Sequence, residues 1–281
     1  MQKSHLRKSK EWNAERYAQG NWIQEAAALK FLQESGIDFS HKKIFDIGCG
    51  TGNITAKIAE SAQQVHGIDA SKNMIEYAQK VYGSIPNLSF EHCFAEDFIT
   101  QEPYDLAVSF FCLHYIQDKQ EALKKISLGL KNNGEFFCVV NTAGNRVPMG
   151  IIVATEVSSK LKESYDFFKE HDFVRDSGTS YFTTDEELKA MLAAAEFEIL
   201  SYEAKGMSFA IKDRQEFENI HYPLIMSLDV VQKMPNSLQQ LFFKEYIDLF
   251  LSKLQQNEDG HYIFPGIHSM VFHARKVKGV L

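Results

Sequence analysis

Apolar and polar positions along residues 42–141 form a regular succession of strand-like and helix-like segments. Short apolar runs that end at glycine or a polar residue are typical of buried strands, and apolar residues three and four apart are typical of helices that cover a sheet. The alternation of the two predicts βαβ units with parallel strands. We expect strands at Lys43–Ile47, Gln64–Asp69, Leu88–Cys93, Tyr104–Phe111 and Glu135–Val140, and helices at Asn53–Ser61, Lys72–Tyr82 and Asp118–Leu130, the last stopped by Asn132, Asn133 and Gly134.

The remaining segments add helices and two further strands to this α/β pattern. Thr184 and Glu187 have the spacing of a capping box, which predicts a helix over Glu186–Ala195. Helical spacing also marks Ile151–Leu161, Asp213–Ile225 and Ser237–Leu254, and strands are expected at Phe197–Glu203 and His268–Lys276. We predict one domain with a doubly wound, mostly parallel seven-stranded sheet. Its parts are N-terminal lid helices (10–35), a core (42–141), helical cap insertions (142–181 and 212–256) and closing strands (197–203 and 268–276).

Composition and charge narrow the classes of partner. The 281 residues carry a formal net charge of −7, which disfavours a nucleic-acid partner. No apolar run approaches the roughly 18 residues of a membrane span. The basic stretch Lys3–Lys10 lacks the apolar core of a signal peptide, so we expect a frayed terminus. Four cysteines without a CxxC pair predict reduced thiols, a cytoplasmic location and no metal site. We expect a monomer or a weak dimer with a small-molecule acceptor.

The most informative motif follows the first strand, where Asp46-Ile47-Gly48-Cys49-Gly50-Thr51-Gly52 leads into a helix. Glycines at such a turn let the backbone approach a ligand closely. A dinucleotide fingerprint reads GxGxxG, but here the third glycine comes one residue early and Asn53 takes its place. Asp46 would repel a pyrophosphate, whereas it suits the ammonium and sulfonium of S-adenosylmethionine (SAM). Spacing and charge therefore favour a SAM site and oppose an NAD(P) oxidoreductase.

The ends of the next strands supply the rest of this expected site. Asp69 ends the second strand, 17 residues after Gly52, where a carboxylate accepts from both ribose hydroxyls. An isolated Asp at a strand end is otherwise a helix cap. The turn Ala95-Glu96-Asp97 follows the third strand and can meet the adenine edge. Ser109 and Phe110 end the fourth strand, beside the methionine portion of SAM.

These motifs together resemble the motif series of class I SAM-dependent methyltransferases. The resemblance rests on the glycine-rich motif, Gly67-Ile68-Asp69-Ala70-Ser71 with Met74, Ala95-Glu96-Asp97, and Tyr104-Asp105-Leu106 through Leu113-His114-Tyr115. It implies a Rossmann-like fold, SAM as cofactor and S-adenosylhomocysteine (SAH) as product. Phe94 departs from the pattern, since many relatives have Asp there, which leaves Ala95 and Glu96 to hold the adenine. The implied cofactor-binding residues are Tyr17, Asp46, Ile47, Gly48, Cys49, Gly50, Asp69, Ala70, Met74, Ala95, Glu96, Asp97, Ser109 and Phe110.

Two narrower families are also similar. The opening Glu11–Tyr17 and the end, from Phe243–Tyr246 to Ala274–Lys276, resemble trans-aconitate methyltransferases. The stretch Ser109–Tyr115 resembles insect juvenile hormone acid methyltransferases. Both families methylate a carboxylate on a small acid, and the insertion 142–181 follows neither. The resemblance therefore implies O-methylation of a small carboxylic acid, with C- or O-methylation of a quinone precursor or another small aromatic, and SAM binding without turnover, as alternatives.

The chemistry determines which side chains the site needs. A carboxylate acceptor is ionised at neutral pH and needs no general base, so the protein must supply alignment and exclude water. An acceptor that arrives protonated needs a base, for which His114 is the candidate, with local packing as its alternative role. Trp12, Tyr17 and Trp22 are expected in a lid over cofactor and substrate. Tyr115 and Tyr222 are candidates to offer hydroxyls to the acceptor, and Arg16 or Arg146 to pair with its carboxylate.

Overall fold

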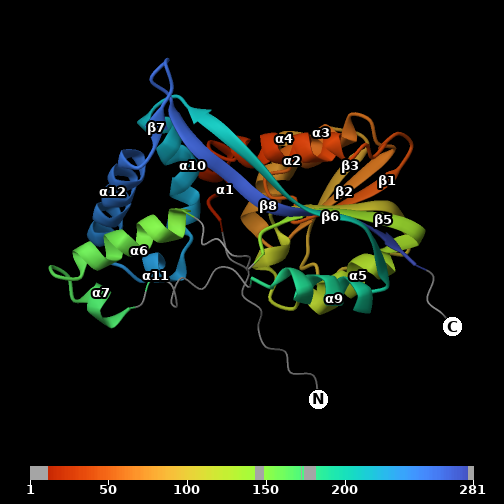
Figure 1. Cartoon of the computed structure of the whole chain (residues 1–281). Coiled ribbons are helices and arrows are strands. Elements are labelled where there is room, and N and C mark those ends of the chain that lie inside the picture. Colours follow the sequence, from red (N-terminus) through yellow and green to blue (C-terminus); the bar gives the residue numbers. More distant parts are fainter. Residues whose placement is uncertain (1–11, 143–148, 172, 174–181, 278–281) are drawn as a thin grey trace.

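A single mixed sheet organises the protein (Figure 1), whose computed structural model describes residues 12–142, 149–171, 173 and 182–277. Neighbouring strands follow the order β3-β2-β1-β4-β5-β8-β6, and β7 pairs only with β8. The first five strands are parallel, whereas β8 runs antiparallel to both β5 and β6. The strands are β1 (Lys43–Ile47), β2 (Gln64–Asp69), β3 (Leu88–His92), β4 (Tyr104–Phe110), β5 (Leu130–Val140), β6 (Phe197–Ile211), β7 (Gln255–Gln256) and β8 (Tyr262–Lys276).

Helices cover both faces of the sheet because successive strand residues point to opposite sides. Ile44 packs into the apolar cluster beneath α2, α3 and α4, and its neighbour Phe45 packs into the cluster beneath α5 and α9. The helices are α1 (Ala14–Ala18), α2 (Trp22–Glu34), α3 (Asn53–Ala59), α4 (Lys72–Tyr82), η1 (Leu113–Tyr115), α5 (Lys119–Gly129), α6 (Met149–Leu161), α7 (Phe167–Glu170), α9 (Asp185–Ala194), α10 (Arg214–Met226), α11 (Asp229–Gln232) and α12 (Asn236–Ser252). The predicted Rossmann-like, doubly wound α/β fold is confirmed.

Local signals placed most element boundaries correctly. Gln64–Asp69 and Lys72–Tyr82 match their elements in full, and the capping box forms, with Thr184 and Glu187 bonded to each other's backbone N–H. The expected helix stop at Asn132–Gly134 is wrong: α5 ends at Gly129 and β5 begins at Leu130. The polar residues form an irregularity within β5, where Asn133 has φ 62° and the pairing with β4 shifts register. Within the described residues, no helix is long and apolar enough to cross a membrane.

The two closing strands are much longer than the sequence predicts. Strands β6 and β8 pair from Phe197 opposite Lys276 to Ile211 opposite Tyr262, so they continue beyond the other strands as a two-stranded ribbon. The predicted ends, 197–203 and 268–276, cover only the half that lies near the sheet. Residues 204–211 contain Gly206 and lack a regular alternation of apolar and polar side chains, and their pairing with β8 makes them a strand.

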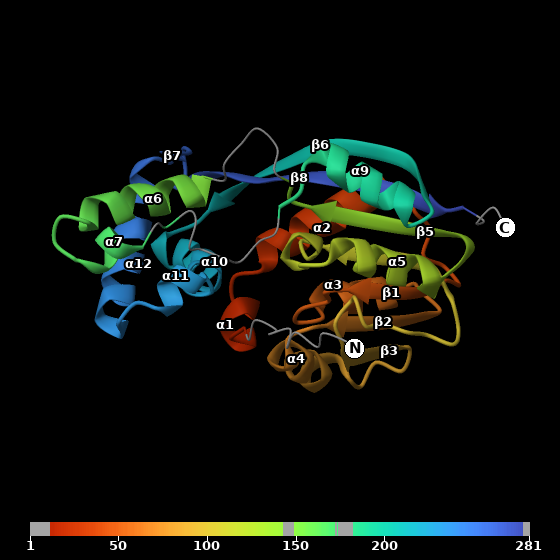
Figure 2. The ribbon, with the colours of Figure 1, turned by 90° about the horizontal axis from the view of Figure 1, so that it is seen from below.

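The ribbon leads to a group of helices at the carboxyl-end side of the parallel strands. Helices α6 and α7 come from the first expected insertion and α10, α11 and α12 from the second, and they pack together around buried Phe217, Phe242 and Tyr246. Figure 2 shows α1 between this group and the sheet, and α1 contacts both α10 and α4. Residues 143–148 and 174–181 of the first insertion, and Lys3–Lys10, lie outside the described residues. The division into lid, core and cap within one domain stays a prediction.

Candidate functional site

The glycine-rich loop connects β1 to α3 and curls back over β2. Gly48, Gly50 and Gly52 all have positive φ, of 74°, 54° and 80°, which side chains with a Cβ rarely adopt. The N–H groups of Gly48 and Cys49 donate to the carbonyl of Ile68 in β2 at 2.8 and 3.0 Å. A Cβ on Gly48 would lie 2.1 Å from Cys112 Sγ, whereas a Cβ on Gly50 would meet no atom within 4 Å. Gly50 therefore presents bare backbone to open space.

Two carboxylates flank this loop in different environments. Asp46 is buried, and its Oδ2 accepts from Thr55 Oγ1 at 2.7 Å. Burial raises the pKa of Asp46 to about 7, against the lowering effect of the Thr55 bond. Asp69 ends β2 and accepts backbone N–H bonds from Gly50 at 3.0 Å and Ser71 at 2.8 Å. It therefore ties the loop to the start of α4 while holding its carboxylate at the strand tip.

A small cavity of about 40 Å³ lies between the loop and the N-terminal helices. Two of the atoms around it are buried acceptors without a hydrogen-bond partner: Asp46 Oδ1 and Gln24 Oε1. Buried polar atoms are almost always hydrogen-bonded, so two such acceptors at one cavity suit a ligand that carries donors. The cavity is lined by Tyr17, Asn21, Gln24, Glu25, Asp46, Gly48, Cys49, Gly50, Thr51, Asn53, Ile54, Phe110 and Phe111.

Hydrogen bonds fasten the junction of α1 and α2 to the loop. Asn21 Nδ2 donates to Thr51 Oγ1 at 3.0 Å and to Asn53 Oδ1 at 3.3 Å. The other end of the Asn53 amide, Nδ2, donates to Glu25 Oε2 at 2.7 Å. The first turn of α2, which supplies Gln24, is thus held against the glycine-rich loop. Sequence reasoning missed Asn21, Gln24 and Glu25, because nothing local distinguishes them from other polar helix residues.

Aromatic side chains from α1 and η1 meet at the carboxyl end of β4. The Trp12 ring centroid lies 5.7 Å from that of Tyr17 and 5.9 Å from that of Tyr115. His114 is buried between Tyr115, at 4.4 Å, and Phe182, at 5.8 Å. The Nδ1 atom of His114 accepts a long bond of 3.4 Å from the backbone N–H of Asn141. The structure therefore brings Trp12, Tyr17, His114 and Tyr115 together, and their roles toward cofactor and substrate stay predictions.

Burial shifts the pKa values of the titratable groups at this end toward their neutral forms. It lowers the pKa of His114 to about 3, with a smaller contribution from nearby Lys119. It raises the pKa of Tyr115 to about 12, and it raises the pKa values of Tyr17 and Cys112 as well. Burial also lowers the pKa of Lys119 to about 8, which leaves this ammonium mostly charged at neutral pH. Lys119, a buried cation that donates to the carbonyl of Ile116, was not singled out from the sequence.

Comparison with known proteins identifies the family. The methyltransferase domain family matches residues 44–134. A protein of Invertebrate iridescent virus 6 that is named as a methyltransferase is 26% identical over 243 residues, which cover 86% of each chain. The juvenile hormone acid O-methyltransferase of Bombyx mori is 23% identical over 257 residues, which cover 84% of this chain and 85% of that protein. The chain belongs to the class I SAM-dependent methyltransferases.

Solved structures show the same fold as this methyltransferase. YcgJ from Bacillus subtilis superposes with a TM-score of 0.56 at 16% identity, covering 90% of this chain and 100% of that chain. Phosphoethanolamine N-methyltransferase 2 from Haemonchus contortus, solved with SAH, superposes with a TM-score of 0.56 at 17% identity, covering 95% of this chain and 59% of that chain. These structures confirm the predicted fold. The predicted enzyme class and SAM cofactor are confirmed by the family match and the methyltransferase relatives.

The residues of the methyltransferase fit SAM at the glycine-rich loop. The two unpartnered acceptors, Asp46 Oδ1 and Gln24 Oε1, match the donors of the SAM ammonium group. The open position beside Gly50 leaves room for a ligand against bare backbone, and Asp69 stands at the next strand tip for the ribose. When bound, SAM supplies a methyl group activated by its sulfonium. Within the described residues, no group of His, Cys, Asp and Glu side chains is arranged to hold a metal ion.

The other motif residues occupy different places around this loop. Ser109 Oγ donates to the carbonyl of Ile47 at 2.9 Å, so this hydroxyl ties β4 to β1. Both residues are buried, and Ile47 packs into the cluster beneath α5. Met74, Ala95 and Glu96 are also buried, Ala70 is half-buried and Asp97 is exposed. Their contacts with SAM stay predictions.

Trp22 and Tyr222, which the sequence predicts at the substrate, pack against other residues in the structure. The Trp22 ring does not join Trp12: it packs edge-on against Phe209 at 5.5 Å and on the apolar core beneath α2. Phe209 belongs to the extension of β6, which the sequence did not predict, so its contact with Trp22 was not foreseeable. Tyr222, on α10, stacks beneath the guanidinium of Arg16 at 4.8 Å and touches Phe243. Arg146 lies outside the described residues.

Proposed function

We propose that this methyltransferase transfers the SAM methyl group to a carboxylate oxygen of a small organic acid. The observation that carries the proposal is the neutral, deeply buried His114, whose pKa of about 3 makes its imidazole a weak base. An alcohol or amine acceptor needs a group that removes its proton, and His114 is poorly suited to that role. A carboxylic acid, with an ordinary pKa near 4, reaches the site already ionised. His114 then serves to line the site and position the acceptor.

Two cationic side chains in this region favour an anionic acceptor. Lys119 is close enough to His114 to lower its pKa. Arg16, the neighbour of Tyr17 in the chain, projects from α1 toward α10, held by the Tyr222 ring and by a 2.9 Å bond from its Nη1 to Gln19 Oε1. No carboxylate of the described residues lies within 4.0 Å of Arg16, so its charge is available to an incoming acid. We assign Arg16 to attraction and orientation of the acceptor.

The aromatic side chains around His114 exclude water from the reacting groups, which is the remaining requirement of methyl transfer. Tyr115 and Phe182 pack against His114, and Trp12 packs against Tyr115, which gives an apolar surface that suits the hydrocarbon body of an acid. The juvenile hormone acid O-methyltransferase of Bombyx mori, by its name, methylates an acid of this kind, which supports the proposal. The same apolar surface would also accept a flat aromatic ring, so a quinone precursor is the second candidate acceptor.

We further propose that α1 acts as a lid. Tyr17 lines the cofactor cavity, whose volume of about 40 Å³ is far below the roughly 300–1,000 Å³ of pockets that hold ligands of this size. An outward shift of α1 would open this space, and Trp12 and Tyr17 would then lie over the bound pair. The short α1 is held through Asn21, through the stacking of Arg16 on Tyr222 and through contacts with α4 and α10, and these are the contacts that its release would break.

The test is transfer of radiolabelled methyl from SAM to a panel of small carboxylic acids, with phenols and quinols of similar size alongside. We expect label in a product that alkali hydrolyses to methanol, because methyl esters are base-labile and methyl ethers and C-methyl groups are not. Label in a base-stable product would overturn the carboxylate assignment in favour of the aromatic one. Transfer to neither group would contradict a small-molecule acceptor.

Two variants test the roles of the side chains. Arg16→Gln should raise KM for the acid about tenfold with little change in kcat, and Arg214→Gln, whose guanidinium is paired with Glu218 and Asp248, is its control. His114→Asn should keep a kcat within about tenfold of the parent and the same pH profile. A loss of a thousandfold together with loss of a pH-dependent limb would instead make His114 a general base.

A further inference from the structure

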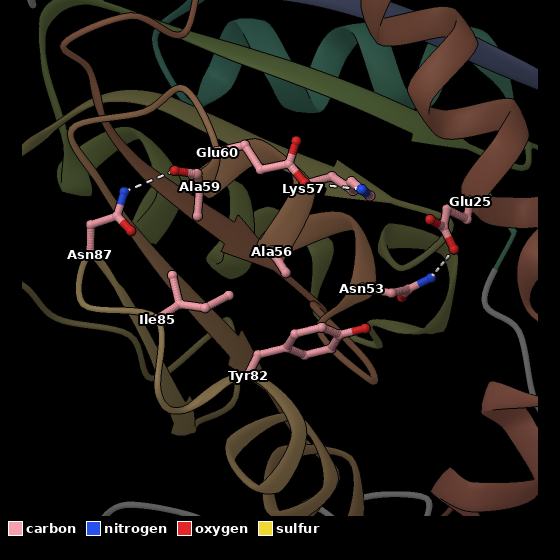
Figure 3. A pocket seen from close by; sticks show the side chains of 9 residues that line it. All are labelled: Glu25, Asn53, Ala56, Lys57, Ala59, Glu60, Tyr82, Ile85 and Asn87. Atoms are coloured by element: carbon pink, nitrogen blue, oxygen red, sulfur yellow. Dashed lines mark hydrogen bonds and ion pairs between the residues drawn. The ribbon is translucent and has the colours of Figure 1, made fainter.

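A second, larger cleft lies beside α3. Its volume is about 480 Å³, within the roughly 300–1,000 Å³ of small-molecule sites. Figure 3 shows it between α3, the first turn of α2 and the end of α4. It shares only Glu25 and Asn53 with the cofactor cavity. The cleft is lined by Glu25, Asn53, Ala56, Lys57, Ala59, Glu60, Tyr82, Ile85 and Asn87.

One end of this cleft carries a carboxylate that has no ion pair among the described residues. Glu25 accepts from the neutral amide of Asn53 at 2.7 Å, and no cationic side chain of the described residues lies within 4.0 Å of it. Lys57 is the cation on the lining. Its Nζ is bonded to Glu60 at 3.0 Å, and that bond is the main reason its pKa is raised, with a smaller electrostatic contribution from Glu25. With two carboxylates and one ammonium, the lining has a formal charge of −1.

The floor of the cleft is apolar and aromatic. The Tyr82 side chain lies across it with the hydroxyl directed toward the Asn53 end, and Ile85, Ala56 and Ala59 cover the rest (Figure 3). Burial, and after it the charge of Glu25, raises the pKa of Tyr82, so the phenol stays neutral and its ring face remains a partner for a cation. Asn87 donates to the carbonyls of Ala59 and Ala62 at 2.9 and 3.0 Å, which holds the far wall in place.

We propose that this cleft is a second ligand site, which binds a small organic ammonium with an apolar body. The ammonium lies against the Glu25 carboxylate and the Tyr82 ring, and the body extends over Ile85 and Ala56. Charge excludes phosphates and carboxylates from the same position. Oε2 of Glu25 continues to accept from Asn53 Nδ2, while Oε1 accepts from the ammonium. The hydrogen bond that separates this cleft from the glycine-rich loop is therefore preserved. The cleft and the cofactor cavity therefore fill at the same time.

The first experiment titrates the full chain with 2-phenylethylammonium, followed by calorimetry, with and without saturating SAH. We expect binding that SAH does not displace and that is about tenfold or more tighter than that of 2-phenylethanol or 3-phenylpropanoate, which keep the ring and change the charge. Equal binding of the alcohol would overturn the charge assignment. Displacement by SAH, or no binding at millimolar concentration, would overturn the site.

Matched variants locate the ammonium. Glu25→Gln should weaken 2-phenylethylammonium about tenfold or more, because it removes the charge and keeps the shape. Glu60→Gln is the control: it makes the same change on the same lining, in a carboxylate already bonded to Lys57, and should change affinity less than about twofold. Tyr82→Leu should weaken the probe severalfold while SAH affinity, which reports the fold, stays constant. If Glu25→Gln and Glu60→Gln behave alike, the proposal is wrong.

Discussion

Ionised Asp46 lowers the free energy of unfolding and is also expected to bind the cofactor. The substitution Asp46→Asn should change these two properties in opposite directions. The pKa of Asp46 is about 7 in the folded protein against an ordinary value of 3.8, because burial disfavours the charged form. A difference of about three pKa units corresponds to roughly 4 kcal/mol against the folded state at pH values well above 7. The Asn amide carries no charge, but it places an unpartnered N–H group where Oδ1 lies, which costs about 1–3 kcal/mol.

We therefore expect Asp46→Asn to stabilise the cofactor-free protein at pH 8 by about 1–3 kcal/mol, a rise of several degrees in Tm. Because the folded pKa lies above the unfolded one, the folded state binds more protons between pH 4 and 7. The cost of ionised Asp46 is complete above pH 7 and fades as the pH falls, so the advantage of Asn shrinks by about 2–3 kcal/mol between pH 8 and pH 5. SAH affinity, in contrast, should fall about tenfold or more with loss of the carboxylate.

Thermal unfolding at pH 8 and pH 5, with calorimetric titration of SAH, measures both effects. Asp105→Asn, at the start of the neighbouring strand β4, is the matched control. Partial burial raises the pKa of Asp105, but its bonds from Lys131 Nζ and the Lys43 N–H, at 2.6 and 2.9 Å, outweigh this and lower it. This variant should lose stability at pH 8. A lower Tm for Asp46→Asn at pH 8, or a gain that does not depend on pH, would refute the reasoning.

Four further outcomes follow from the site. Asp69→Ala should weaken SAM binding by roughly 1.5–3 kcal/mol by loss of bonds to the ribose; unchanged affinity in a folded variant would remove Asp69 from the site. Gly50→Val should abolish SAH binding while unfolding stays cooperative, because its side chain enters open space beside the loop. Gln24→Leu should weaken SAH more than 5′-methylthioadenosine, which lacks the amino-acid portion; equal losses would contradict an ammonium contact. Removal of residues 1–22 should cut methyl transfer severely in a folded core, and full activity would disprove the lid.

The sequence by itself determined the features of this protein that depend on residues close together in the chain. The alternation of strands and helices over 42–141, the register of Asp46 with the glycines, and Asp69 at the next strand tip identified the fold, the cofactor and the enzyme class. These features can be predicted from sequence because backbone geometry at a strand-to-helix turn depends on the few residues that form it.

Only the tertiary structure decided which distant groups surround that loop. Gln24 is an ordinary helix residue until α2 is bonded to the loop through Asn21, and Trp22 becomes a core residue only through the extension of β6. The weak basicity of His114 likewise arises from burial by segments far away in the chain. Solvation and electrostatic energies depend on every neighbour in space, whereas periodicity and motif spacing record only neighbours in sequence.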